Sequence, residues 1–381
     1  VDTYVFDASG PTRMLFDGFA PNNNGNFRWA LVGPRGTEIG DRSIYYSESH
    51  ELGATNPVVD LPVAGRYQVR IWANGNTTGD YGFRVLDIAK GTPITVGNDI
   101  DGTLDPSNET DVYRFDAVAG NRVFFNHLAQ DPTHNDYVTW RLIDPLGRQV
   151  WGPVNFRTDV AATTLTRSGT YTLLVEGRIW STVSFDYRFN VQPVPADPAP
   201  VALVLGVETV GHLEAAGQKN TYTFDLASED LYYFDSLTDK AISWTLTGPD
   251  GVVLGRTLQN ADAYERGHDN PILRLGPGSY TLAFDGSGDA VGEYRFRVFA
   301  LAQAAVDFIP GTVVDDTLDS SRETHVYRFD AVAGERYFLD YISYRGYNDA
   351  TYRLIDAHGN QVWGGYDWPN DRAMGAFATG G

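Results

Sequence analysis

The chain has 381 residues, of which 42% are apolar, and its 29 Lys and Arg against 49 Asp and Glu give a formal net charge of −20. The apolar share excludes a disordered chain, and the acidic excess excludes nucleic acid as a partner because its phosphates would be repelled. The sequence contains no run of about 18 or more apolar residues that could span a bilayer. The absence of cysteine excludes disulfide bonds, thiolate metal sites and a cysteine nucleophile, and it favours an exported bacterial protein.

The sequence is a tandem array of four similar segments. The decapeptide DVYRFDAVAG at residues 111–120 returns as HVYRFDAVAG at residues 325–334, and VDTYVFDASG and KNTYTFDLAS are looser forms of it. Three further motifs follow the decapeptide in the same order, and in the second copy they read WRLIDPLG, GTYTLLV and YRFNV. We call each set of aligned motifs a column. The first tyrosine of the motif recurs at intervals of 109, 109 and 105 residues, at Tyr4, Tyr113, Tyr222 and Tyr327. Such a period defines the architecture before any other feature is interpreted.

Each column predicts a β-strand, because apolar and polar residues alternate along it. In VYRFDAV, Tyr113 and Phe115 share a face that Arg114 does not, and in WRLID the tryptophan and leucine share a face while the arginine points away. Turns such as DPLG, GPDG and GPRG separate the strands. We expect antiparallel sheets with one side facing water, and about eight strands in each copy. The predicted fold class is all-β, a tandem array of antiparallel β-sandwich domains, jelly-roll-like in arrangement.

The columns place the domain boundaries at 1–90, 91–196, 197–304 and 305–381. The first copy lacks the segment that precedes the other three, and the last stops before its third column, so we expect the chain to be a piece of a longer polypeptide. The proline-rich segment QPVPADPAP at residues 192–200 predicts an extended linker. The other two junctions are shorter and more apolar, which favours packing between neighbouring repeats. Copies 2 and 4 share YRFDAVAG, RLID and QVWG, which indicates duplication of a two-domain unit.

These motifs resemble the bacterial pre-peptidase C-terminal domains, which are β-sandwich modules of secreted proteins. The resemblance rests on ETDVYRFDAVAG at residues 109–120, on WRLIDPLG and on GTYTLLVEG. It covers copies 2 and 3 fully and copies 1 and 4 in part. It implies a non-catalytic accessory module of exported proteases, or repeats in large surface and adhesin-like proteins. Related collagen-binding domains use calcium, but no residue-by-residue match carries a collagen site to this chain.

The sequence contains no catalytic motif. The seven histidines show no HExxH or HxH spacing, and there is no GxSxG elbow, Walker loop or GxGxxG loop. His325 replaces an aspartate of copies 1 and 2, which indicates a structural or solvent-exposed role. Because a catalytic centre does not require four similar copies in register, we predict a protein that is not an enzyme.

Carboxylates cluster in the segments that precede two of the repeats. NDIDGTLD contains Asp99, Asp101 and Asp105, and VDDTLD stands at the same place in copy 4. Oxygen ligands gathered in a loop are what calcium prefers. An EF-hand register fails, because it would put Gly97 at the first ligand position, and copy 3 lacks the cluster. Solvated turn residues are therefore the favoured interpretation and calcium is the alternative cofactor, with these candidate ligands: Asp99, Asp101, Asp105, Asp315, Asp316 and Asp319.

Aromatic residues supply the last candidates. WGGYDWPND resembles a sugar-stacking platform, but Trp363 and Trp368 align with Trp151 and Phe156 of copy 2, which favours a structural role. SIYYSESH near Tyr45 has no counterpart and is the better binding candidate.

Two classes of function follow. The first is a structural and interaction array, a stalk or adhesin-like region at the bacterial cell surface or outside the cell, in which neighbouring repeats are partners. The second is a module whose loops bind carbohydrate or protein, with or without calcium. A third reading is an accessory region of a secreted protease.

Overall fold

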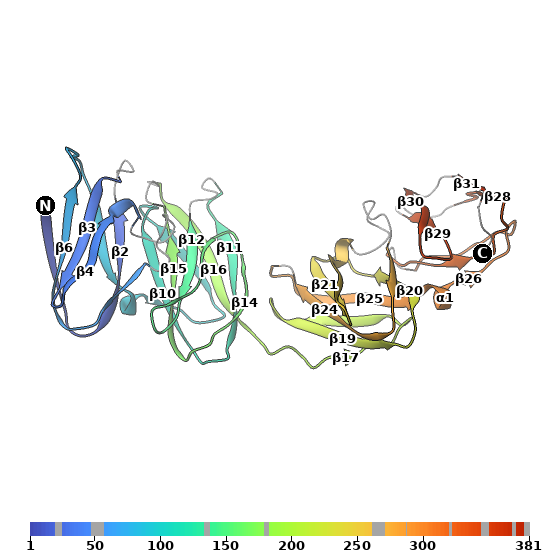
Figure 1. The fold of residues 1–381 in the computed structure, drawn as a ribbon, viewed down its shortest axis with the longest axis horizontal. Coiled ribbons are helices and arrows are strands. Elements are labelled where there is room, and N and C mark those ends of the chain that lie inside the picture. Colours follow the sequence, from blue (N-terminus) through green and yellow to red (C-terminus); the bar gives the residue numbers. More distant parts are fainter. Residues whose placement is uncertain are drawn as a thin grey trace. The chain divides into compact units, whose positions relative to one another are not determined.

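The computed structural model describes residues 1–19, 25–46, 57–132, 138–178, 183–260, 271–286, 288–319, 322–343, 350–367 and 371–376. The chain forms two compact units, Val1–Val194 and Pro195–Gly381. Each unit is described by itself below (Figure 1). The predicted linker coincides with the division between the units, although strand β16 continues into it as far as Val194.

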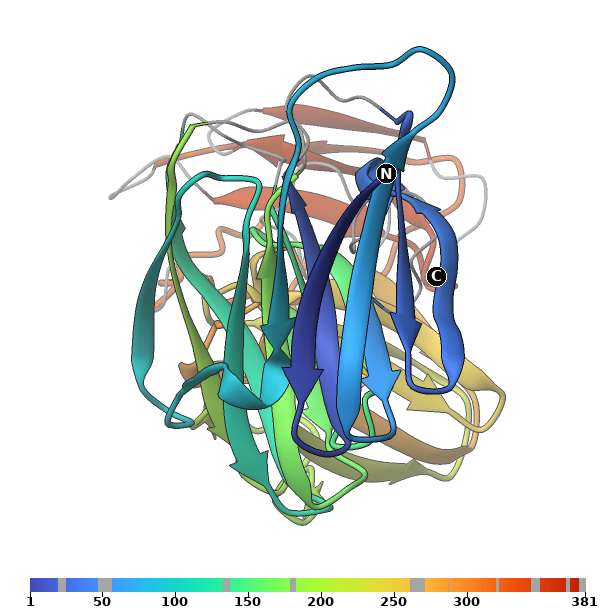
Figure 2. The ribbon, with the colours of Figure 1, turned by 90° about the vertical axis from the view of Figure 1, so that its left-hand side faces the viewer.

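The first unit begins with repeat 1, which is a sandwich of two sheets. The first sheet has the order β1-β6-β3-β4 and the second has the order β5-β2-β7. Figure 2 shows these blue and cyan strands nearest the viewer. The elements are β1 (Asp2–Ala8), β2 (Thr12–Phe19), β3 (Phe27–Gly33), β4 (Gly36–Ser43), η2 (Ile44–Tyr46), β5 (Val58–Leu61), β6 (Gly65–Ala73), β7 (Gly82–Asp87) and η3 (Ile88–Lys90).

Repeat 2 follows with a five-stranded first sheet, β13-β12-β15-β10-β8, and a four-stranded second sheet, β14-β11-β16-β9. Its strands are β8 (Thr92–Pro93), β9 (Asp99–Leu104), β10 (Thr110–Ala117), β11 (Arg122–Gln130), β12 (Thr139–Ile143), β13 (Gln149–Asn155), β14 (Val160–Thr164), β15 (Gly169–Glu176) and β16 (Phe185–Val194).

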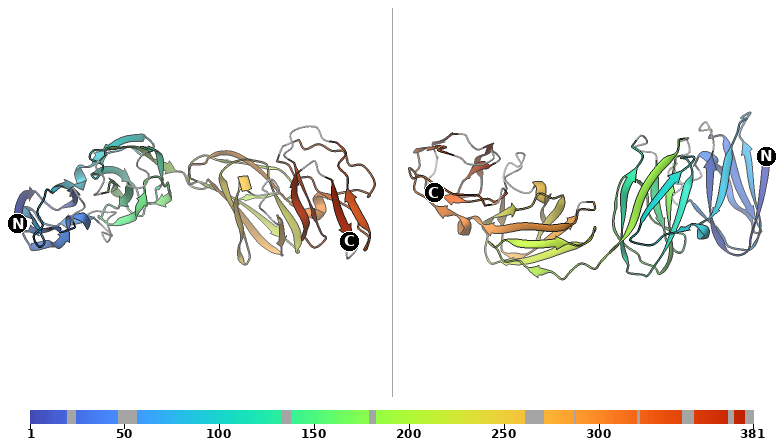
Figure 3. Two further views of the ribbon diagram at one scale, coloured as in Figure 1. Left: turned by 90° about the horizontal axis from the view of Figure 1, so that it is seen from above. Right: turned by 180° about the vertical axis from the view of Figure 1, so that it is seen from behind.

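The second unit begins with repeat 3, which has the same two sheets, β17-β19-β24-β21-β22 and β18-β25-β20-β23. Figure 3 shows them from two further sides. Its elements are β17 (Val201–Ala202), β18 (Thr209–Leu213), β19 (Lys219–Leu226), β20 (Asp230–Ser236), β21 (Ile242–Gly248), β22 (Gly251–Thr257), η4 (Leu258–Asn260), β23 (Ile272–Leu275), β24 (Gly278–Gly286) and β25 (Gly292–Ala300). Repeat 4 contains α1 (Leu301–Ala304), β26 (Val306–Asp307), β27 (Tyr327–Arg328), β28 (Arg336–Leu339), β29 (Thr351–Ile355), β30 (Gln361–Asp367) and β31 (Arg372–Ala376).

The predicted fold class, an all-β array of antiparallel β-sandwich domains, is confirmed. The complete repeats contain a five-stranded and a four-stranded sheet, nine strands instead of the expected eight. We call the segment that precedes the decapeptide motif in a repeat its lead-in, and the strand that contains the motif its motif strand. The additional strand is a two-residue segment of the lead-in, β8 or β17, and it pairs in parallel with the motif strand. No helix among the described residues is long and apolar enough to cross a membrane.

The repeated motif fills the same core site in three repeats. Phe115 lies opposite Tyr171 in the ladder of β10 and β15, and their rings stack with centroids 5.8 Å apart. The equivalent rings stack at 5.6 Å in repeat 1 and at 5.3 Å in repeat 3. The aromatic position of the motif therefore recurs in repeats 1 to 3 because each of these sandwiches places the same ring pair in its core.

The expectation of a solvent-facing side is wrong for the first sheet of repeat 2. Ile143 and Leu174 lie on the side opposite the core of that sheet, yet both are fully buried. They pack with Leu15 and Ile88 of repeat 1 in a separate apolar cluster, which Val58, Leu86 and Val112 complete. The period of two correctly separated the two faces, but a neighbouring sandwich covers the face that was expected to be wet.

Repeat 2 also buries polar side chains. Arg141 and Glu176 are both fully buried, and their side chains form an ion pair at 3.0 Å. Arg141 Nη1 also donates to Gln149 Oε1 at 2.7 Å. In repeat 4, Arg353 Nη1 donates in the same way to Gln361 Oε1 at 2.8 Å. Copies 2 and 4 therefore carry the same arginine and glutamine pair, on β12 and β13 and on β29 and β30.

Candidate functional site

A network of hydroxyl and carboxyl groups joins the two sheets of repeat 2. Tyr113 on β10 and Tyr187 on β16 place their hydroxyl oxygens 2.7 Å apart. The Tyr187 hydroxyl also donates to Asp111 Oδ2 at 2.6 Å. Burial raises the pKa of Tyr113 to about 12 and raises the pKa of Tyr187 further. Burial also raises the pKa of Asp111, against the opposing effect of the Tyr187 hydrogen bond.

Gly102 on β9 makes space for this network. A Cβ at this position would lie 2.3 Å from Tyr187 Cζ and 2.7 Å from the Tyr113 hydroxyl. Gly211 stands in the same relation to Tyr294 and Tyr222 in repeat 3, at 2.2 and 2.6 Å. The glycine of the lead-in is thus a packing requirement of the buried tyrosine pair.

The same network recurs in the other sandwiches. In repeat 1 the Tyr4 and Tyr81 hydroxyls are 2.9 Å apart and Tyr81 donates to Asp2. In repeat 3 the Tyr222 and Tyr294 hydroxyls are 3.2 Å apart, and Asn220 replaces the carboxylate. Because the hydroxyl network is present in repeats 1, 2 and 3, it is a structural connection between the two sheets. It does not mark one repeat as a functional site.

The candidate calcium ligands of copy 2 do not form a loop. Asp99 and Asp101 lie on strand β9 with exposed side chains. Asp99 accepts hydrogen bonds from Arg188 at 2.9 Å and from Asn190 at 2.7 Å. Asp101 lies 3.6 Å from Arg188. The predicted loop is therefore a strand, and these carboxylates face an arginine of the neighbouring strand β16.

Asp105 follows the end of β9, and its backbone is held by a side chain. The N–H of Asp105 donates to Glu109 Oε1 at 2.8 Å. In the same way, the N–H of Glu214 donates to the Gln218 side chain in repeat 3, and the N–H of Asp319 donates to the Glu323 side chain in repeat 4. The lead-in turn thus has the same side-chain cap in three repeats.

In repeat 4, Asp315, Asp316 and Asp319 are exposed and lie outside any strand. His325 bridges two carboxylates, with Nδ1 3.0 Å from Asp316 and Nε2 2.9 Å from Glu323. Burial acts to lower the pKa of His325, but the hydrogen bonds with Glu323 and Asp316 outweigh it and raise the pKa. The Tyr327 hydroxyl donates to the same Asp316 carboxylate.

Within the described ranges, no three carboxylate or imidazole side chains are grouped closely enough to hold a metal ion. Calcium binding by the six aspartates stays a prediction, which a calcium-dependent melt can test.

The aromatic candidates are mostly structural where the structure describes them. Phe156 is fully buried in the core of repeat 2, and Trp151 packs against that core. Tyr45 packs against the core of repeat 1. Trp363 contacts Tyr352 edge to face at 5.5 Å between centroids. Trp368 lies outside the described residues.

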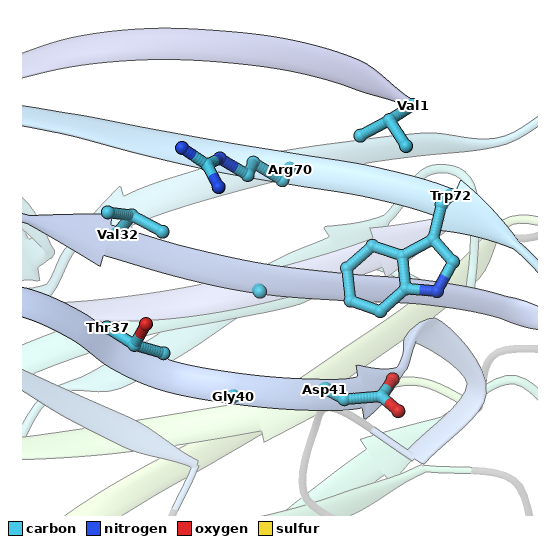
Figure 4. Close-up of a pocket in the computed structure, with 8 residues that line it drawn as sticks. Val1, Val32, Thr37, Gly40, Asp41, Arg70 and Trp72 are labelled. Atoms are coloured by element: carbon cyan, nitrogen blue, oxygen red, sulfur yellow. The ribbon is translucent and has the colours of Figure 1, made fainter.

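Sequence reasoning missed a groove on the outer face of the first sheet of repeat 1. This shallow groove has a volume of about 430 Å³, and Figure 4 shows the Trp72 indole lying along the sheet beside it. Arg70 extends from β6 and Asp41 from β4, on either side of β3 (Figure 4). Asp41 accepts a hydrogen bond from Arg28 Nε at 2.6 Å. The lining residues are Val1, Ala30, Val32, Thr37, Gly40, Asp41, Arg70 and Trp72.

A signal for this groove was present in the repeat alignment. Trp72 stands where copies 2 and 3 have Glu176 and Asp285. Ala30 stands where copy 2 has Arg141. A tryptophan on an outward strand position that is acidic elsewhere marks a surface specific to copy 1.

Comparisons with known proteins found no match to any protein family and none among curated proteins. Among solved structures, the chain is similar to a pre-peptidase C-terminal domain of collagenase from Bacillus anthracis, with 17% identity, a TM-score of 0.22, and coverage of 27% of this chain and 96% of that one. It is also similar to the CUB1-EGF-CUB2 domain of human MASP-1/3, with 9% identity, a TM-score of 0.18, and coverage of 52% and 99%. Tripeptidyl peptidase 2 matches with 8% identity, a TM-score of 0.17, and coverage of 76% and 30%. At these TM-scores none of the three carries an argument about function.

Proposed function

We propose that the chain is a non-catalytic structural and interaction region, a stalk or adhesin-like array of a large exported bacterial protein at the cell surface or outside the cell. The observation that supports this proposal is the face-to-face contact between repeats 1 and 2. Ile143 and Leu174 bury against Leu15 without a long flexible connection. Removing independent motion between neighbouring sandwiches is a property that a spacer requires, because flexible junctions would shorten its reach.

Small-angle scattering of the full chain tests the spacer. A single compact globule of this length would have a radius of gyration of about 21 Å. We expect a clearly larger value that does not change with protein concentration. A value close to that of the compact globule would contradict the stalk.

The groove on repeat 1 supports a second candidate function, binding of carbohydrate or protein on the outer sheet face. It combines an indole surface on Trp72 with the guanidinium of Arg70 and the carboxylate of Asp41. An apolar ring flanked by a few fixed polar groups is the usual composition of a ligand site. The equivalent face of repeat 3 carries Thr245 and Thr247, which offer no such ring.

A glycan array probed with the labelled full chain tests this second function. Trp72→Ala should reduce binding by about tenfold or more, because truncating an aromatic anchor costs roughly 2 kcal/mol at a binding site. Thr247→Ala, on the equivalent face of repeat 3, is the matched control and should leave binding unchanged. Equal binding by both variants would remove the groove from consideration.

A further inference from the structure

An ion pair with a fully buried carboxylate joins two strands of the second sheet of repeat 1. Asp17 on β2 and Arg84 on β7 are direct cross-strand partners. Arg84 Nε donates to Asp17 Oδ2 at 2.5 Å, and the Asp17 side chain is fully buried. The two side chains point away from the core of repeat 1, toward repeat 2.

The pair holds one residue of repeat 2 by its backbone. Thr110, the first residue of β10, donates its N–H to Asp17 Oδ2 at 3.2 Å. Its carbonyl oxygen accepts from Arg84 Nη2 at 2.7 Å. Arg84 Nη1 also lies 3.0 Å from Glu109, the preceding residue. We call this arrangement the clamp: an aspartate and an arginine that bind the N–H and the C=O of one threonine.

The second unit repeats the clamp. Asp235 on β20 and Arg297 on β25 are cross-strand partners, with Arg297 Nη2 2.6 Å from Asp235 Oδ2. Arg297 Nη2 donates to the Thr324 carbonyl at 3.1 Å. Thr324 donates its backbone N–H to Asp235. Thr324 precedes the second copy of the decapeptide just as Thr110 precedes the first.

The aspartate, the arginine and the threonine are all absent at the remaining boundary between repeats. In repeat 2 the equivalent cross-strand pair is Asn126 and Asn190. Asn190 Nδ2 donates to Asp99 of its own repeat at 2.7 Å. In repeat 3 the residue equivalent to Thr110 is Lys219, whose N–H donates at 2.9 Å to Asp197 of the segment that precedes it. The three positions therefore change together from repeat to repeat.

Asp17 and Asp235 are fully buried, whereas the Arg84 and Arg297 side chains are 35% and 25% exposed. The desolvation of a buried carboxylate offsets much of its attraction to the arginine, so such a pair is a poor source of net stability. Burial raises the pKa of Asp235 even though Arg297 acts in the opposite direction. Apolar residues such as Leu15 and Leu174 supply the buried area of the contact in the first unit. A costly polar group in an apolar contact is best explained by a role in orientation, since it penalises every arrangement that leaves it unsatisfied.

We propose that the outer face of the second sheet in repeats 1 and 3 is a docking surface for the first sheet of the following repeat, and that the clamp fixes the orientation of the docked repeat by binding the backbone N–H and C=O of the residue that begins or precedes its motif strand. Within each unit, the repeat that carries the aspartate and the arginine receives its successor on this face. The inference concerns the rule of assembly and holds whether or not the array serves as a stalk.

Spin labels on the full chain test this proposal, because the sequence has no cysteine and introduced cysteines carry the only labels. Thr37→Cys with Ala161→Cys reports on repeats 1 and 2, and Val252→Cys with Val362→Cys reports on repeats 3 and 4. Both pairs should give a single narrow distance distribution by pulsed electron paramagnetic resonance. Arg84→Gln should broaden the first distribution and leave the second unchanged, and hydrogen exchange of peptides from repeats 1 and 2 should show that both sandwiches stay folded.

A charge-reversed variant separates binding of the Thr110 backbone from simple attraction between the two side chains. Asp17→Arg combined with Arg84→Asp keeps the ion pair but presents a cation to the N–H of Thr110 and an anion to its C=O. This variant should stay as broad as Arg84→Gln. Asn190→Ala, at the equivalent position of repeat 2, is the matched control and should leave the first distribution narrow.

Two outcomes would overturn the proposal. A narrow distribution in Arg84→Gln would mean that the apolar contact alone orients the two repeats. A narrow distance distribution in the charge-reversed variant would mean that the two side chains act only on each other and that their bonds to the Thr110 backbone do not orient repeat 2.

Discussion

The Tyr113 hydroxyl lies 2.7 Å from the Tyr187 hydroxyl and joins the two sheets of repeat 2 at a buried point. Tyr187 in turn donates to Asp111, so the Asp111 carboxylate accepts a hydrogen bond from a tyrosine hydroxyl. Repeat 3 has the same tyrosine pair but uses Asn220, which carries no charge. The two repeats therefore form a natural comparison of one network with and without a carboxylate.

Removing the Tyr187 hydroxyl should destabilise repeat 2. Tyr187→Phe leaves the half-buried Asp111 without its donor, and an unsatisfied polar group costs about 1–3 kcal/mol. Tyr294→Phe in repeat 3 is the matched control and should cost less, because Asn220 retains a bond to the His212 carbonyl. Hydrogen exchange of peptides from each repeat in the full chain measures both losses. Equal losses would show that the carboxylate has no special dependence on the hydroxyl.

The core assignment of the motif gives a second prediction. Phe115 is 3% exposed, so Phe115→Ala should reduce the free energy of unfolding of repeat 2 by about 3–5 kcal/mol. Arg114 is half-buried and donates from Nε to the Gly91 carbonyl at 3.0 Å. Alternation places Arg114 on the face opposite Phe115, and because it has this hydrogen bond, Arg114→Ala should cost about 0.5–1.5 kcal/mol. A loss in Arg114→Ala as large as that in Phe115→Ala, measured by denaturant unfolding with hydrogen exchange, would contradict the strand assignment.

Calcium binding can be tested with repeat 3 as an internal control, because it lacks the aspartate cluster. A ligand that binds only the folded state stabilises it by about 2.7 kcal/mol at a hundredfold excess over Kd. If Asp99, Asp101 and Asp105 bind calcium, millimolar calcium should raise the stability of repeat 2 but not of repeat 3, and Asp101→Asn should abolish the effect. If calcium and a chelator leave the stability of both repeats unchanged, these carboxylates are ordinary solvated residues, with Asp99 and Asp101 paired with Arg188.

Two histidines should titrate in opposite directions from the ordinary value of about 6.5. The pKa of His325 is raised by its bonds to Glu323 and Asp316 against the effect of burial, and the pKa of His127 is lowered by burial. His325 therefore contributes stability that is present below about pH 6.5 and is lost as the pH rises through its folded pKa. His127 contributes stability above about pH 6.5 that is lost as the pH falls through its folded pKa.

Nuclear magnetic resonance titration of the imidazole protons measures both midpoints in the full chain, with His325→Gln and His127→Gln to assign the signals. Midpoints that fall together near 6.5 would contradict the carboxylate bridge at His325 and the partial burial of His127.

The sequence by itself determined the four-fold repetition, the all-β class and the residues of each core. The period of two places Phe115 and Tyr171 on one face, and this arrangement is local to a pair of strands, so no tertiary information is required.

Only the tertiary structure decided what covers the outer faces of the sheets. Leu174 and Ile143 stand on the side that alternation assigns to solvent, and a neighbouring sandwich buries both. The pattern within a strand records which side is apolar, but it does not record which other domain meets that side. Asp17 and Arg84 are distant in sequence from Thr110, and only the docking of one repeat on another brings their side chains to its backbone. The physical reason is that strand alternation is a local property, whereas burial of an outer face depends on contacts between separate domains.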